Sequence, residues 1–259
     1  MSANYDSENP VFVQPVARLA PGVRVASTLR IGGVSRGSYA SLNLGAHCGD
    51  QDDCVLKNRA ILRSALNLSS EPSWIEQVHG TDIVDASLVG ATPVQADGVY
   101  TQSVNEVCAI MTADCLPLVL TDYLGKQIMA VHVGWRGLAA GIVENAVQLF
   151  DCSAFDIQSW AGPCIGPQKF EVGPEVIEQL GGSVAAYQIS ENGEGRYYAN
   201  LSMLVAERLR NCGVMHFSSA KQCTYLNPQH FFSYRREGQT GRMATLIWKE
   251  IPDKQLFNG

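Results

Sequence analysis

Three short runs of apolar residues in the middle of the chain set the strongest limit on its fold. They span residues 107–111, 116–120 and 128–133, and polar or turn-forming residues separate them. Uninterrupted apolar runs of this length are typical of fully buried strands. Pro117 lies near the start of the second run, where a strand tolerates the missing N–H donor. The pattern predicts a buried sheet at the centre of the molecule.

Helical patterns flank these runs. Residues 51–66 carry an apolar stripe at helical spacing, made of Val55, Leu56, Ile61, Leu62 and Leu66. A second helix is expected over about 138–150, a third from an Asn200 N-cap to Gly213, and a last strand over 243–248. This mixture predicts an α/β or α+β fold. Since no linker separates two cores, we expect one domain over 1–259, with 1–12 as a loose N-terminal tail.

The charge balance argues against a nucleic-acid partner. The chain has 19 Lys and Arg against 25 Asp and Glu, a net charge of −6, and no dense basic run to neutralise phosphates. No run approaches the ~18 apolar residues of a membrane span. The first residues do not show the basic segment followed by an apolar stretch that is typical of a secretion signal. We therefore expect a cytoplasmic protein with its eight cysteines reduced, and no membrane partner.

Three side chains at predicted strand ends have the donor atoms of a small metal site. His79 precedes a glycine turn, Cys115 lies between two apolar runs, and His132 comes at the end of the third run. Two imidazoles and a thiolate are the ligand number of a catalytic zinc site, whose fourth position stays open for water or substrate. The alternative from residue type alone is that Cys115 and the histidines are ordinary core residues.

Two arginines beside glycines are candidates for anion binding. Arg136 lies between Gly134 and Gly137, where a helix is expected to begin. Arg30 is the first residue of a glycine-rich loop, residues 30–45. Arg235 and Arg236 follow an aromatic stretch and are expected to be structural ion-pair partners. Asp114, next to Cys115, is a candidate general acid, although a role in stabilising its turn is favoured.

Several segments resemble those of a known bacterial family. Gln77-Val78-His79-Gly80, Thr112-Ala113-Asp114-Cys115-Leu116-Pro117 and His132-Val133-Gly134-Trp135-Arg136-Gly137 are similar to the three signature segments of the YfiH family, also called the laccase-domain or polyphenol oxidase family. Further matches include Ser41-Leu42-Asn43-Leu44, Gly162-Pro163-Cys164-Ile165-Gly166 and Phe231-Phe232-Ser233-Tyr234-Arg235-Arg236. They run in order from about residue 28 to 242. Val133 and Lys57 depart from the usual family residues.

The resemblance implies a single-domain, four-layer α/β/β/α sandwich with mixed sheets. It also implies a zinc ion held by His79, Cys115 and His132, with Arg30, Asn43 and Arg136 as candidate residues for substrate or phosphate. The implied reaction is phosphorolysis of a purine nucleoside: adenosine, inosine, guanosine or S-methyl-5′-thioadenosine reacts with phosphate to give the base and a (methylthio)ribose 1-phosphate. Adenosine deamination is an implied companion activity. The oligomeric state is left open.

Competing functions differ in what they require of these residues. A multicopper laccase needs about ten histidines, and five cannot supply its copper sites, so this function is rejected. Copper remains a possible adventitious substitute for zinc at a His₂Cys site. A cysteine-type amide hydrolase that edits peptidoglycan precursors, with Cys115 as nucleophile and His132 as its base, is the alternative. A module that only binds has no need of this convergent set.

Overall fold

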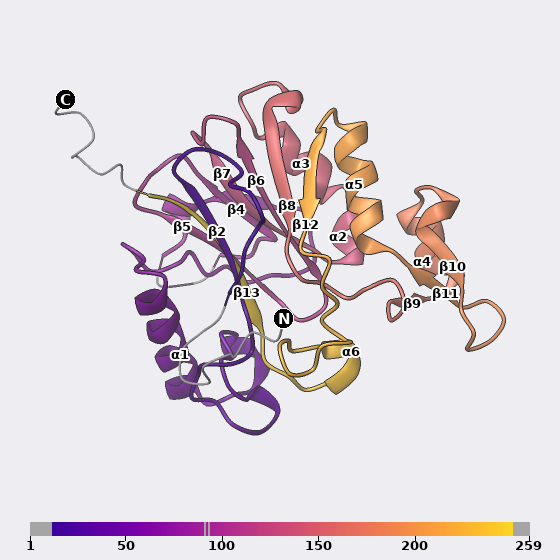
Figure 1. The fold of residues 1–259 in the computed structure, drawn as a ribbon, viewed down its shortest axis with the longest axis horizontal. Helices are drawn as coiled ribbons and strands as arrows, with labels where there is room; N and C mark the ends of the chain where they lie inside the picture. Colours follow the sequence, from indigo (N-terminus) through magenta and orange to yellow (C-terminus); the bar gives the residue numbers. More distant parts are fainter. Residues whose placement is uncertain (1–11, 91, 93, 251–259) are drawn as a thin grey trace.

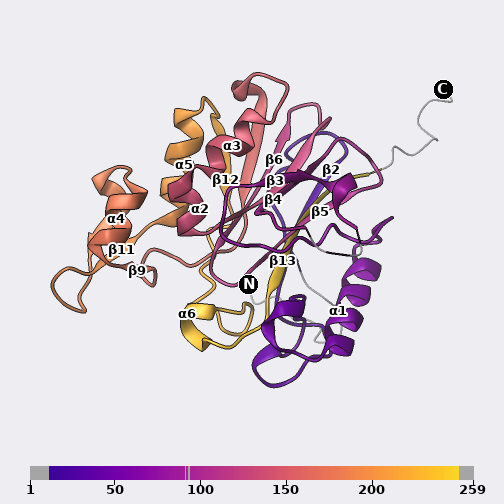
Figure 2. The same ribbon diagram turned by 180° about the vertical axis from the view of Figure 1, so that it is seen from behind.

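Two β-sheets packed face to face form the centre of the molecule, and helices cover their outer faces (Figure 1, Figure 2). The computed structural model describes residues 12–90, 92 and 94–250. The predicted tail over 1–12 therefore lies outside the described residues, apart from Phe12, which begins the first strand. The layer order is α1, a four-stranded sheet, a six-stranded sheet, and then α2, α3 and α5, so the expected four-layer α/β/β/α sandwich is confirmed.

The four-stranded sheet is antiparallel throughout, in the order β1-β2-β13-β5. Its strands are β1 (Phe12–Val13), β2 (Val23–Thr28), β5 (Val107–Thr112) and β13 (Met243–Lys249). The last strand of the chain thus lies between two strands from its first half. The expected strands over 107–111 and 243–248 are confirmed as β5 and β13.

The six-stranded sheet is mixed, in the order β12-β8-β6-β7-β4-β3, with parallel pairs at its two edges. Its strands are β3 (Ile83–Asp85), β4 (Gly98–Thr101), β6 (Leu116–Asp122), β7 (Ile128–Val133), β8 (Ile157–Ala161) and β12 (His216–Ser219). The antiparallel pair β6 and β7 lies in the middle and corresponds to the other two apolar runs.

The structure describes six helices, of which α1, α2, α3 and α5 form the outer layers. The six are α1 (Asp52–Ala65), α2 (Trp135–Ala140), α3 (Ile142–Gln148), α4 (Pro174–Leu180), α5 (Leu201–Asn211) and the short α6 (Tyr234–Glu237). Five 3₁₀ turns, η1 to η5, cover Gly37–Tyr39, Ala46–Cys48, Ala86–Leu88, Ala154–Asp156 and Val184–Ala186. None of the described helices is long and apolar enough to cross a bilayer.

A small third sheet projects from the body beside α4 (Figure 1). It is antiparallel, in the order β10-β11-β9, and its strands are β9 (Glu171–Val172), β10 (Tyr187–Ile189) and β11 (Tyr197–Ala199). The chain passes from β11 directly into α5, whose N-cap is Asn200 as predicted, because its side-chain oxygen accepts a hydrogen bond from Met203 N.

The layering explains why the central strands carry apolar residues on both faces. In β5, Val107 and Ala109 pack toward α1, whereas Cys108 and Ile110 face the six-stranded sheet. Side chains on a strand alternate between its two faces, so a strand between two apolar layers needs apolar residues on both. All residues of β5, β6 and β7 are buried.

The structure corrects the helix expected over 138–150. Two helices, α2 and α3, replace it because Gly141 between them has a left-handed backbone with φ of 97°. Its N–H bonds back to Gly137 O and Leu138 O, which ends α2. Glycine adopts this conformation without the steric cost that a side chain would add.

The stripe predicted on α1 is wrong at one position. Val55 and Leu62 are buried, but Leu56 is 63% exposed. Asn58 is buried in its place, where its amide donates to Ser35 Oγ and to two backbone carbonyls of the glycine-rich loop, those of Ser41 and Asn43. The helix thus docks through a polar anchor as well as an apolar face.

This difference gives a stability test with a matched control. We expect Leu62→Ala to lower the free energy of unfolding by about 2–5 kcal/mol, because it leaves a cavity in a packed core. Leu56→Ala on the same helix removes the same atoms from an exposed position and should change it by less than about 0.5 kcal/mol. Denaturant unfolding of both variants measures this. Equal losses would contradict the packing described here.

Candidate functional site

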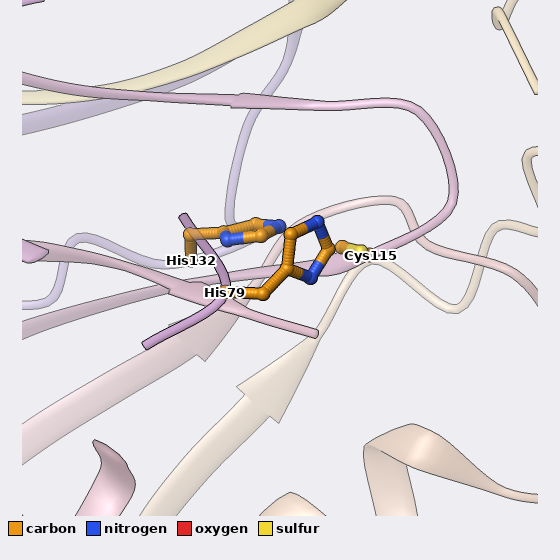
Figure 3. A group of neighbouring side chains, drawn as sticks. All are labelled: His79, Cys115 and His132. Carbon is orange, nitrogen blue, oxygen red and sulfur yellow. The ribbon is translucent and has the colours of Figure 1, made fainter. Parts of the chain in front are cut away.

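The structure brings His79, Cys115 and His132 together (Figure 3). His79 lies in the loop before β3, Cys115 in the turn from β5 to β6, and His132 near the end of β7. One ligand atom from each lies within 4.8 Å of the other two. The two imidazole rings meet edge to face, with centroids 4.7 Å apart. His132 is buried, Cys115 is half-buried and His79 is exposed, so the group opens to one side.

A buried carboxylate, Asp97, holds the loop that carries His79. Its oxygens accept hydrogen bonds from the backbone N–H groups of Val78, His79 and Gly80, at 3.2, 3.0 and 2.6 Å. The backbone of His79 is left-handed, with φ of 61°. A residue with a side chain keeps such a conformation only where its surroundings impose it. Here the three hydrogen bonds to Asp97 impose it.

The same carboxylate orients the second histidine. His132 Nδ1 lies 2.7 Å from Asp97 Oδ1. Because an ionised carboxylate only accepts, Nδ1 carries a proton, and loss of the other ring proton leaves the Nε2 lone pair for a metal. Metal-binding histidines characteristically have this arrangement.

The surroundings of His132 favour a positive charge. Burial alone would lower the pKa of His132, but the negative charge of Cys115 and the hydrogen bond to Asp97 outweigh burial and raise the pKa to about 9. Burial also works against ionised Asp97, yet the hydrogen bonds from His132 and the 78–80 backbone keep the pKa of this carboxyl below its usual value. A metal cation that replaces the proton on Nε2 would satisfy the same two anionic groups.

A second buried carboxylate holds the turn that carries Cys115. Asp114 accepts hydrogen bonds from the Thr224 hydroxyl at 2.6 Å, the Ser233 hydroxyl at 3.0 Å and the Arg235 backbone N–H at 2.7 Å. Its backbone is also left-handed, with φ of 96°. With its oxygens used in this way, Asp114 ties the turn to the C-terminal part of the chain. This supports the structural role favoured for it over that of a general acid.

Gly134 lets β7 and α2 approach the group closely. A Cβ atom at this position would lie 2.6 Å from His79 Nδ1 and 3.4 Å from Cys115 Sγ. The first distance is shorter than any non-bonded contact allows, so a side chain here would displace His79.

A cavity of about 510 Å³ lies next to the group. Apolar and aromatic side chains form much of its wall: Met111, Trp135, Ile165, Phe170, Leu201 and Tyr234. Arg136, Arg235 and Arg242 also line it, while the carboxylate of Asp114 in its wall is already bonded within the protein. The cavity therefore suits a ligand with a flat apolar part and a negative charge.

Arg136 is available to such a charge. Its guanidinium lies over the Trp135 ring, 4.5 Å from the centroid. Within the part of the chain that the structure describes, it forms no ion pair with a carboxylate. Arg235 was expected to be a structural ion-pair partner like Arg236, and the two differ. Arg236 pairs with Glu237 at 2.8 Å, whereas Arg235 bonds to the Glu171 carbonyl and lines the cavity.

Arg30 and Asn43 are not placed with the other candidates. Arg30 pairs with Glu237 at 2.9 Å and donates to the carbonyls of Ala40 and Pro228. Asn43 is fully buried, and neither residue lines the cavity. Asn43 Oδ1 accepts the backbone N–H of Arg242, so it supports the cavity wall from behind.

Sequence reasoning missed Asp97, Arg242 and His47, which lines the cavity with Arg242. No strand was expected after Asp97, so no local signal marked this residue. Its partner His132 lies 35 positions away, so no local pattern connects them. The same holds for Arg242 and His47, which lie at opposite ends of the chain.

The three donors fit a metal ion. Bonds of about 2.0–2.1 Å to nitrogen and 2.3 Å to sulfur place tetrahedral ligands about 3.5 Å apart. The ligand atoms lie at most 4.8 Å apart, and small side-chain rotations would shorten these separations to about 3.5 Å. The oriented His132, the half-buried thiol and the cavity on the open side complete the arrangement of a metal centre with a free position.

Known proteins of similar sequence cover nearly the whole chain. Residues 24–250 match the family model described as multi-copper polyphenol oxidoreductase laccase. The chain is 44% identical over 239 residues to the purine nucleoside phosphorylase YfiH of Shigella flexneri, covering 92% of this chain and 98% of that protein. It is 39% identical over 242 residues to the purine nucleoside phosphorylase of Haemophilus influenzae, with coverages of 92% and 99%.

Solved structures agree with this assignment. A Neisseria meningitidis protein of the DUF152 family superposes with a TM-score of 0.86 at 35% identity, covering 94% of this chain and all of that one. YlmD from Geobacillus stearothermophilus superposes with a TM-score of 0.86 at 31% identity and coverages of 93% and 100%. The chain belongs to the YfiH family, whose model carries the laccase description.

Proposed function

We propose that the protein is a zinc-dependent purine nucleoside phosphorylase. The observation that carries the proposal is a His₂Cys group opening into a cavity whose charged lining is dominated by arginines. The relatives named as purine nucleoside phosphorylases, at 39–44% identity over most of the chain, support the same reaction. The substrates are adenosine, inosine, guanosine or S-methyl-5′-thioadenosine, together with inorganic phosphate.

In the reaction a phosphate oxygen attacks C1′ of the nucleoside, and the bond from C1′ to N9 breaks with its electron pair going to the purine. The proton of hydrogen phosphate ends on the purine, which balances the equation. Arg136 binds the phosphate through charge-assisted hydrogen bonds. The aromatic wall formed by Phe170, Trp135 and Tyr234 packs against the flat base and excludes water.

His79, Cys115 and His132 would hold the metal. When bound there, zinc supplies Lewis-acid stabilisation of the phosphate or of a water nucleophile and neutralises charge that develops during the reaction. A water nucleophile also fits the proposed companion activity, deamination of adenosine. Release of ammonia from adenosine in the absence of phosphate measures that activity separately.

The laccase description of the family model raises the question of copper. A His₂Cys group accepts Cu(II) at least as readily as zinc. The whole chain has five histidines, however, which is half of what the copper sites of a multicopper oxidase require. We therefore assign copper the role of an adventitious substitute. Metal analysis of freshly purified protein, combined with phosphate-dependent release of hypoxanthine from inosine, tests the proposed function directly.

A second candidate function rests on the closeness of Cys115 and His132. Their side chains lie within 4.8 Å, near enough for a thiolate–imidazolium pair in metal-free protein. Such a pair could attack an amide bond, as in an enzyme that edits peptidoglycan precursors. Metal occupancy separates the two functions, since a thiolate bound to zinc is a poor nucleophile.

Replacement of Cys115 by Ser distinguishes ligand from nucleophile. We expect Cys115→Ser to lose metal content and phosphorolysis in parallel, because a neutral hydroxyl is a far weaker zinc ligand than a thiolate. Excess zinc should restore part of the activity. Metal content by mass spectrometry and inosine cleavage are measured on the same samples. Full metal occupancy with no activity, or a covalent thioester on Cys115 of the wild type, would favour the hydrolase.

Asp97 provides a test that leaves the ligands themselves intact. We expect Asp97→Asn to weaken zinc binding about 10–100-fold, since it disturbs the carboxylate that orients His132 and the His79 loop. The matched control is Asp122→Asn, which alters a buried carboxylate that accepts the N–H groups of Leu124 and Gln127 at the other end of β6. Zinc affinity should stay unchanged in the control. An equal loss in both would point to general destabilisation.

The anion site is tested at Arg136. We expect Arg136→Ala to raise KM for phosphate about 10- to 100-fold, since hydrogen bonds to charged groups contribute about 1.5–3 kcal/mol. Metal content should not change. Arg63→Ala, an exposed arginine on α1, is the control. Steady-state kinetics with varied phosphate give the answer, and an unaltered KM would assign Arg136 a purely structural role.

A further inference from the structure

His47 lines the cavity but is not one of the three grouped donors His79, Cys115 and His132. It lies in η2 (Ala46–Cys48), at the end of the glycine-rich loop. Across the residues that the structure describes, its ring makes no hydrogen bond, so both ring nitrogens are available to a ligand. Three of the other polar groups of the wall are less free: Gln77 bonds to the Met111 backbone, Asp114 is saturated, and Arg235 bonds to a carbonyl.

The backbone that presents His47 is held at several points. Asn43 Oδ1 accepts the N–H groups of Gly45 and Arg242, at 3.0 and 2.9 Å. The Tyr39 hydroxyl donates to the Cys48 carbonyl at 2.7 Å, and Leu44 N donates to the Arg242 carbonyl. The anchoring positions the imidazole relative to the cavity wall.

Arg242 links His47 to the metal-binding group. Burial lowers the pKa of His47, and the positive charges of Arg242 and Arg59 lower it further. Burial and the charge of His132 likewise lower the pKa of His79, and Arg242 contributes there too. Arg242 lines the same cavity as both histidines. The His47 ring is neutral near pH 7, with one N–H donor and one acceptor nitrogen.

Phosphorolysis requires stabilisation of the negative charge that develops on the departing purine base. As the bond between C1′ and N9 breaks, its electron pair spreads over the five-membered ring of the purine, and negative charge builds up on N7. A donor aimed at N7 gains strength as that charge develops, so it stabilises the transition state more than the bound nucleoside. In the proposed function, Arg136 and the metal-binding group hold the phosphate. The purine base therefore lies against a different part of the cavity wall.

We infer that His47 donates a hydrogen bond from its ring N–H to N7 of the purine base and so selects purine nucleosides. The inference rests on the proposed function and names the residue that recognises the leaving group. Asn43, which the sequence suggested for substrate binding, acts through this loop as a positioning residue. Arg242, held by the same Asn43 oxygen, forms the wall beside the base.

Two bases that differ at one atom test the inference. Hypoxanthine has an acceptor nitrogen at position 7, and 7-deazahypoxanthine has a C–H there. We expect the wild type, loaded with zinc, to bind hypoxanthine about tenfold more tightly by calorimetry, a typical difference for one hydrogen bond. His47→Ala should bind the two bases equally. His47→Gln, which keeps an N–H donor, should recover part of the preference. His216→Ala, an exposed histidine on the edge strand β12, should behave like the wild type.

Kinetics give a second readout. In His47→Ala we expect kcat for inosine to fall about 10- to 100-fold while metal content and KM for phosphate stay unchanged. A wild type that binds the two bases equally, or a preference that persists in His47→Ala, would overturn the inference. Absence of inosine cleavage by zinc-loaded wild type would instead overturn the proposed function, while the binding comparison would still show whether His47 contacts N7.

Discussion

The hydrogen bonds of the buried Asp97 carboxylate are the interactions on which the group of His79, Cys115 and His132 depends. A carboxylate is stable inside a protein only when its oxygens are paired, and Asp97 is paired by three backbone N–H groups and one imidazole. Its position follows from the sheet, since Asp97 directly precedes β4 and its carbonyl accepts the N–H of His132 in the neighbouring β7. One side chain thus determines the backbone of His79 and the tautomer of His132 together.

Asp114 holds Cys115, the third residue of the group, in a similar way. It connects the turn that carries Cys115 to Thr224, Ser233 and Arg235, so the C-terminal third of the chain closes the site. The oxygens of both carboxylates already accept hydrogen bonds, and among the described residues the cavity arginines Arg136, Arg235 and Arg242 form no ion pair with a carboxylate. A protein with a net charge of −6 therefore has a cavity suited to anions. Local arrangement, and not total charge, decides what this site attracts.

Much of the fold was predictable because the signals are local. The uninterrupted apolar runs predicted the strands β5, β6 and β7, since a strand between two layers must be apolar on both faces. The prediction failed at positions where apolar spacing alone does not decide the local structure. Gly141 breaks a helix that the apolar spacing alone extends to 150, and Leu56 lies outside the buried face, whose third position belongs to Asn58. Periodicity detects the spacing of apolar residues and cannot predict buried polar contacts such as those of Asn58.

The sequence by itself determined the strands β5, β6, β7 and β13, the placement of His79, Cys115 and His132 at turns or strand ends, and the family resemblance. The structure brings these three together, as the resemblance implied. The tertiary structure alone decided that Asp97 orients two of them and that Arg242 and His47 share a wall. Asn43 and Arg242 are 199 positions apart, and their contact exists only because β13 returns to pair with β2 and β5. Local sequence encodes which face of an element is buried. Packing between distant segments is set by the sum of many weak contacts, which no short pattern contains.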